Sequence, residues 1–200
     1  MDVFTKTYPA PPYDKEEIFR YAGIKGDARE FTGLAEECLG EAEGKLSFRV
    51  CYARFPVSVR GDSVDLAFAA PRSSALAKNL AGCAFAYVFA ATVGIGIDRL
   101  IAKYAVLSPA KAVMFQAIGA ERIESLCNAF CGDLAREEGC ALKPRFSPGY
   151  GDLPLALQKD IFRALRCEKN IALTLNESLL MSPSKSVTAI VGFAGKTAAL

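Results

Sequence analysis

The sequence contains no histidine and no tryptophan. The absence of histidine excludes His-based general acid–base catalysis, Ser–His or Cys–His nucleophile pairs, and imidazole ligation of a metal. No run of lysine or arginine occurs, and 24 basic against 22 acidic residues leave a formal net charge of +2. This balance provides no extended basic surface for nucleic acid, so we expect no nucleic-acid partner.

The seven cysteines form no Cys-x-x-Cys motif. The opening segment, MDVFTKTYPAPP, lacks the apolar core of a signal peptide, so we expect a cytoplasmic protein with reduced thiols. Cys127 and Cys131 are four residues apart and would share one helix face. Because other clustered ligands are missing, they are typical of small buried apolar side chains, with a metal site as the alternative.

The chain has 200 residues, 52% of them hydrophobic, which suits one domain with a substantial core. One uncharged run, residues 79–97, reaches the minimum length of a membrane span. It is rich in alanine and glycine and has no Lys/Arg cluster at one end. We interpret it as a buried strand, residues 83–93, followed by a glycine turn and a helix; a membrane anchor is the alternative.

Hydrophobic periodicity predicts an α+β domain: a mainly antiparallel twisted sheet with packed helices. The division expected along the chain is an N-terminal arm with helices over 1–40 and the main domain over 41–200. The predicted strands are 46–52, 64–68, 83–93, 171–175 and 187–193, and a turn at Gly61-Asp62 joins the first two as a hairpin. The predicted helices are 14–23, 27–40, 73–81, one from 98, 109–138, and one that Asp152 and Pro154 start.

The most unusual local string is Arg145-Phe-Ser-Pro-Gly-Tyr-Gly-Asp-Leu-Pro154. Its glycines let the backbone approach a ligand or adopt positive φ, and its prolines stiffen it. Arg145 offers a planar fork for a carboxylate, and Tyr150 offers a flat face with one hydroxyl. The string suits a small zwitterion that carries a base; the alternative is a turn that positions two helices.

A second polar string, Thr174-Leu-Asn-Glu-Ser-Leu-Leu-Met-Ser-Pro-Ser-Lys-Ser-Val-Thr188, follows a predicted strand. Glu177 would meet a ligand cation there, or it is simply part of a solvated strand end. The fragment Gly94-Ile-Gly96 lacks the third glycine of the dinucleotide fingerprint, so we assign it no nucleotide role.

Together these strings resemble the activation domain family of vitamin B12-dependent methionine synthase, which binds S-adenosylmethionine. Arg145-Phe-Ser-Pro-Gly-Tyr150 matches the family's Arg-x-x-Pro-Gly-Tyr. Leu175-Asn-Glu-Ser-Leu-Leu-Met-Ser-Pro183 matches its Leu-Thr/Ser-Glu-Ser…Met…Pro segment. The order of the motifs also fits, and the resemblance covers about residues 80–194.

The resemblance implies a chemistry that needs no histidine. In the family, an electron donor such as flavodoxin reduces inactive Co(II) cobalamin, and S-adenosylmethionine then methylates the cobalt. Methyl transfer from a sulfonium to cobalt moves no proton, so the protein acts by positioning and electrostatics. The implied cofactors are S-adenosylmethionine and a cobalamin that a partner protein carries.

The resemblance also assigns residues by motif position. Arg145 would bind the ligand carboxylate, and the backbone around Ser147, Pro148 and Gly149 would line the adenosyl part. Tyr150 would complete that wall.

Further positions belong to the second segment and to the preceding helix. Glu177 and Ser178 would shape the pocket or face the cobalamin-bearing partner. Asn128 aligns with an acidic residue that contacts the ligand in the fused enzymes, and Glu124 lies one turn earlier. Ser182 replaces an aromatic residue before the segment's proline, and a later tyrosine of the fused enzymes has no counterpart.

The sequence shows no cobalamin, homocysteine or folate module, so the resemblance predicts a stand-alone reactivation domain. It would act on the cobalamin-binding module of a separate methionine synthase, with a flavodoxin-like or other electron donor and no membrane partner. Two alternatives stay open: an activator of another corrinoid methyltransferase, and a non-catalytic docking adaptor for a cobalamin protein.

Overall fold

The computed structural model describes residues 2–26 and 28–193 of the chain. Its helices are α1 (Lys15–Tyr21), the 3₁₀ helix η1 (Arg29–Phe31), α2 (Thr32–Ala42), α3 (Ser74–Asn79), α4 (Gly96–Leu107), α5 (Pro109–Glu138), α6 (Leu157–Leu165) and α7 (Cys167–Ile171). Its strands are β1 (Phe4–Tyr8), β2 (Phe48–Pro56), β3 (Ser58–Arg60), β4 (Ser63–Asp65), β5 (Phe85–Thr92), β6 (Thr174–Leu175), β7 (Met181–Ser182) and β8 (Ser186–Phe193).

The centre of the fold is a four-stranded antiparallel sheet with the order β1-β2-β5-β8. Phe89 on β5 is opposite Tyr52 on β2 and Ala189 on β8. The predicted α+β class with an antiparallel sheet is therefore confirmed, and the run 79–97 contains the central strand β5. In the described part of the chain, no helix is both long and apolar enough to cross a membrane.

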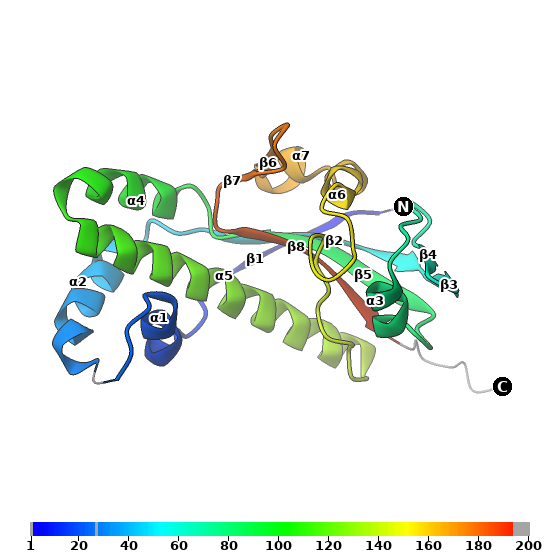
Figure 1. Cartoon of the computed structure of the whole chain (residues 1–200), viewed down its shortest axis with the longest axis horizontal. Coiled ribbons are helices and arrows are strands. Elements are labelled where there is room, and N and C mark those ends of the chain that lie inside the picture. Colours follow the sequence, from blue (N-terminus) through cyan, green and yellow to red (C-terminus); the bar gives the residue numbers. More distant parts are fainter. Residues whose placement is uncertain (1, 27, 194–200) are drawn as a thin grey trace.

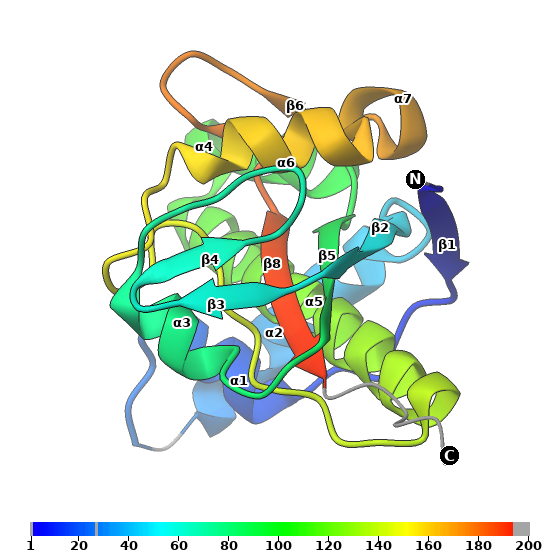
Figure 2. The ribbon, with the colours of Figure 1, turned by 90° about the vertical axis from the view of Figure 1, so that its right-hand side faces the viewer.

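Helices cover both faces of this sheet (Figures 1 and 2). The long helix α5 lies along one face, together with α1, α2 and α4, whereas α6 and α7 cover the other. Each face has its own apolar core because successive side chains of a strand point to opposite sides. The core between the sheet and α5, here called the α5 core, includes Val50 and Ala91. The core between the sheet and α6, here called the α6 core, includes Cys51 and Ala90.

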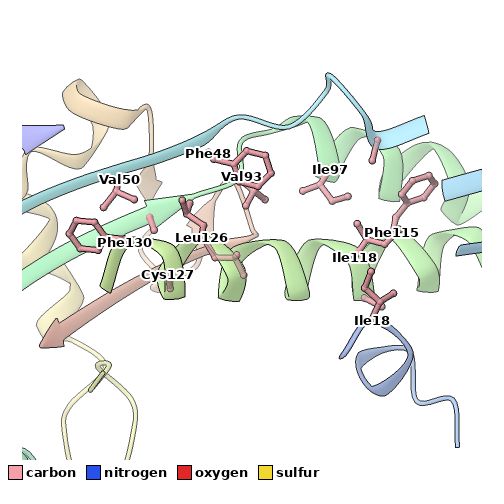
Figure 3. Packing of buried hydrophobic residues seen from close by; sticks show 14 of the residues in the cluster. Ile18, Phe48, Val50, Val93, Ile97, Phe115, Ile118, Leu126, Cys127 and Phe130 are labelled. Atoms are coloured by element: carbon pink, nitrogen blue, oxygen red, sulfur yellow. The ribbon is translucent and has the colours of Figure 1, made fainter. Parts of the chain in front are cut away.

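The apolar stripe of α5 is buried as its spacing predicts. Ile123, Leu126, Phe130 and Leu134 are all at most 5% exposed. Figure 3 shows Leu126 and Phe130 directed toward the strands of the sheet. The ring of Phe130 lies 4.9 Å from that of Phe89 on β5, which fixes α5 against the centre of the sheet.

Local signals place most helix ends. The Asp14 side chain accepts hydrogen bonds from the first-turn N–H groups of α1, and Pro109 occupies the first turn of α5. Gly139 ends α5 with φ +65°. The helix predicted from residue 27 begins later. Its expected capping residue, Asp27, lies outside the described residues, and α2 begins only at Thr32, after the 3₁₀ helix η1.

Two strand predictions are wrong. The turn at Gly61-Asp62 joins β3 to β4, whereas the predicted hairpin joins 46–52 to 64–68, and β4 already ends at Asp65. Strand β2 already pairs with β1 and β5 on its two edges, so no edge is left for the hairpin. Residues 171–175 are not one strand either, because Ile171 ends α7 and Ala172 turns the chain at φ +53°.

The first 40 residues contribute to the same sheet and core as the rest. Strand β1 pairs with β2 over its whole length, and Ile18, Ala35 and Cys38 are buried in the α5 core. A buried pair of side chains, Glu121 and Arg122, binds the arm: Arg122 donates to the carbonyl oxygens of residues 11 and 12. The domain division at residue 40 stays a prediction.

Candidate functional site

The Arg145–Tyr150 string begins beside β8, on the edge of that strand that does not pair with β5. The N–H of Lys143 donates to the carbonyl oxygen of Gly192 (2.8 Å). Phe146 exchanges both backbone hydrogen bonds with Ile190, at 2.9 and 2.8 Å. The segment before the turn is thus held like a short additional strand, and the position of Arg145 is fixed relative to the sheet.

Helix α5 holds the Arg145 side chain. One terminal nitrogen donates to Asn128 Oδ1 at 2.8 Å, and the other donates to Glu124 Oε2 at 2.6 Å. Arg145 is 25% exposed at its side chain and Glu124 is 42% exposed. A guanidinium has five N–H groups, so some remain beyond these two hydrogen bonds and its interaction with the Cys131 thiol. The structure therefore brings Arg145, Asn128 and Glu124 together at the surface.

Two cysteines of α5 lie beside this group. Cys127 is fully buried, and burial raises the pKa of its thiol. Burial also raises the pKa of Cys131, although the Arg145 guanidinium acts in the opposite direction. Within the described ranges, no group of three or more His, Cys, Asp or Glu side chains is arranged to hold a metal ion.

A compact turn follows Arg145. The N–H of Tyr150 donates to the Ser147 carbonyl oxygen (3.1 Å), and the N–H of Gly149 donates to that of Leu153 (2.9 Å). Gly149 has φ +88°, which favours glycine. Pro148 is buried and Ser147 half-buried, whereas Gly149 is exposed and Tyr150 is 69% exposed. The turn presents backbone and an aromatic ring to the outside on a rigid base.

Asp152 anchors this turn to α3. Its carboxylate accepts hydrogen bonds from the N–H of Ser74 (2.7 Å), the N–H of Ala75 (3.2 Å) and the hydroxyl of Ser73. These bonds hold the pKa of Asp152 well below its usual range. The expectation that Asp152 starts the next helix is wrong: α6 begins at Leu157, and the carboxylate instead satisfies the free N–H groups of α3.

The second predicted string forms a separate hairpin. Glu177 and Ser178 are exposed in the loop between β6 and β7, which Asn176 closes by accepting from the N–H of Leu180 (2.9 Å). No hydrogen bond or ion pair joins Glu177 or Ser178 to residues 145–150 in the described part of the chain. Glu177 instead lines a cavity beside α6 and α7, and residues 145–150 do not.

The open edge of β8 is a feature that sequence reasoning missed. Because Ile190 faces Phe146, strand alternation directs the N–H and C=O of Thr188 toward the same edge. The Thr188 side chain is 2% exposed, and its hydroxyl has no hydrogen-bond partner among the described residues. No local signal could have shown this edge, since it depends on which strand becomes the last in the sheet.

Comparison with known proteins identifies the fold of this chain through a solved structure. No protein-family model matches the chain, and no curated protein matches it either. Among solved structures, the chain is similar to the "Crystal Structure of the MetH Reactivation Domain bound to AdoHcy", with a TM-score of 0.74 and 16% sequence identity. The match covers 98% of this chain and 80% of that chain. The α+β architecture described above is thus the fold of the MetH reactivation domain.

Proposed function

We propose that this chain binds S-adenosylmethionine at the Arg145–Tyr150 turn and supports reductive remethylation of cob(II)alamin on a separate B12-dependent methionine synthase. The ordered pair of sequence motifs supports this, as does the fold of a domain whose structure contains AdoHcy, which is S-adenosylmethionine without its methyl group. The observation that carries the proposal is the placement of the motif arginine, paired with Glu124 and Asn128 at the start of a rigid, exposed turn.

The charges around Arg145 suit the amino-acid end of this ligand. The guanidinium offers free N–H groups to a carboxylate, and the half-exposed Glu124 carboxylate offers a partner to an ammonium or sulfonium. Because Arg145 and Glu124 neutralise each other, the pair complements a zwitterion better than a simple anion. Asn128 keeps one side of the guanidinium in place without adding charge.

The turn suits the adenosyl end. The exposed Gly149 leaves its backbone open to close approach, and the Tyr150 ring stands edge-on against Phe146, with 5.4 Å between the ring centroids. This contact holds Tyr150 beside the turn while most of its surface stays free. Backbone groups around Ser147 and Pro148, with the neighbouring β8 edge, would line the rest of this part of the site.

When bound, the ligand would supply a methyl group to the reduced cobalt of the partner's cobalamin, with the reducing electron coming from a separate donor. No residue of this chain has to move a proton in that transfer. Its residues hold the donor at an exposed turn, where a second protein has access. Glu177 and Ser178, on the exposed β6–β7 loop, are proposed to face that cobalamin-bearing partner in the cytoplasm.

Titration calorimetry with S-adenosylmethionine tests the binding site. Arg145→Ala should weaken binding by about 1.5–3 kcal/mol, the scale of a hydrogen bond to a charged group. Arg60→Ala, which removes an exposed arginine on β3, is the matched control and should leave the affinity unchanged. Equal affinities of the Arg145→Ala and wild-type proteins would contradict the site. A wild-type protein that does not bind would favour the docking adaptor.

A further inference from the structure

A second concave site lies between α6, α7 and β6, on the sheet face opposite α5. This cavity, the α6–α7 groove, has a volume of about 890 Å³, within the range of small-molecule sites. Its apolar floor includes Phe162, Cys167, Leu173 and Leu175. Its charged lining residues are Lys159, Arg163, Arg166, Lys169, Glu168 and Glu177.

Positive charge predominates around the groove, with four cationic side chains against two carboxylates. Arg163 is partly neutralised by Asp160, at 3.3 Å. Lys159, Arg166 and Lys169 have no ion-pair partner within residues 2–26 and 28–193. Three cations are therefore available to a ligand at the rim of one cavity.

The floor of the groove is apolar and well packed. Leu173 is fully buried and Cys167 is 1% exposed, while Phe162 is partly buried at the surface of the α6 core. A molecule that bound here would cover the exposed parts of Phe162 and Leu175 and meet cations at the rim.

The backbone around the groove has an uncommon conformation. Arg166 and Ala172, at the two ends of α7, both have positive φ, at +49° and +53°. Non-glycine residues rarely adopt this conformation, and such residues cluster at functional sites. Here they mark the two ends of α7, and Arg166 lies at the junction between α6 and α7.

We propose that the α6–α7 groove binds a small organic anion with an apolar body. Arg166, Lys169 and Lys159 would bind the anionic group, and the partly exposed Phe162 and Leu175 would contact the apolar body. This site is distinct from the proposed S-adenosylmethionine site, whose residues 145–150 do not line the groove. The excess of cations also disfavours a sulfonium ligand.

The probe that tests this is 8-anilinonaphthalene-1-sulfonate, an apolar anion that becomes fluorescent out of water. The double variant Arg166→Gln/Lys169→Gln keeps side chains of similar length and removes two groove cations. It should bind the probe about three- to tenfold more weakly, as expected for two partly exposed charge contacts. The double variant Arg60→Gln/Lys78→Gln removes two exposed cations outside the groove and should bind as the wild type does.

An equal loss in both double variants, or no loss in the groove variant, would overturn the proposal, as would a wild-type protein that does not bind the probe. Added salt should weaken the binding, and the neutral analogue N-phenyl-1-naphthylamine should not distinguish the groove variant from the wild type. Circular dichroism checks that the variant is folded. If it is not, Lys159→Gln/Lys169→Gln, which leaves the α6–α7 corner intact, takes its place with the same expected result.

Discussion

Alanine at Gly149 and at Gly132 should change stability in opposite directions. Gly149 has φ +88°, and a Cβ there would lie 3.1 Å from Leu155 Cδ1. An L-residue in the left-handed region costs about 1–2 kcal/mol, so Gly149→Ala should destabilise the fold by at least that amount. Gly132 lies inside α5, and apart from its chain neighbours and the backbone of that helix a Cβ there would meet no heavy atom within 4 Å. Gly132→Ala should therefore stabilise the protein by about 0.5–1 kcal/mol.

Urea denaturation followed by circular dichroism measures both effects, with unfolding free energies from linear extrapolation. The two variants should differ by about 1.5–3 kcal/mol, the sum of the two estimates. Gly149→Ala should also lower the affinity for S-adenosylmethionine, because the turn changes shape, while Gly132→Ala should not. A Gly149→Ala protein as stable as the wild type would refute the reasoning about the turn.

Five further substitutions test the core and the site. Phe130→Ala should cost about 3–5 kcal/mol in urea denaturation, because it removes a buried ring between α5 and the sheet. Arg122→Met leaves the buried Glu121 carboxylate without its cationic partner and should cost about 3–5 kcal/mol; Glu121→Gln in the same chain should restore part of this, since the bonds from Arg122 to the carbonyl oxygens of residues 11 and 12 stay lost. Asp152→Asn should lower stability at neutral pH. The pKa of Asp152 in the folded protein lies below 3.8, its ordinary value. The stability difference between wild type and Asp152→Asn should therefore shrink as the pH falls below 3.8, which urea midpoints across that range would measure. Glu124→Gln should weaken S-adenosylmethionine binding in calorimetry, because the ligand's cation loses its partner.

Short-range signals were sufficient for much of the fold. The period of α5 predicted its buried stripe, and Asp14, Pro109 and Gly139 marked helix ends, because these features depend only on residues a few positions apart. The strand at 64–68 was paired wrongly because pairing depends on which edges other strands occupy, and β1 from the N-terminus takes one edge of β2.

The candidate site was predictable in part. The motif identifies Arg145 and the turn that follows it. It does not reveal that the Arg145 guanidinium contacts Glu124 and Asn128, because these residues lie 21 and 17 positions earlier in the chain. The sequence predicts that Asp152 starts the next helix because a carboxylate before a proline resembles a local cap. Its actual partners lie 77 to 79 positions earlier in the chain, so no local pattern could reveal them.

Methyl transfer tests the central claim most directly. A cobalamin-dependent methionine synthase without its own activation domain is prepared in the Co(II) state and supplied with a one-electron donor and methyl-labelled S-adenosylmethionine. We predict that this chain and its Arg60→Ala variant abolish the Co(II) absorption band and transfer the label to cobalamin, whereas Arg145→Ala does so far more slowly. Equal transfer with and without the chain, or equal transfer with Arg145→Ala, would contradict the account.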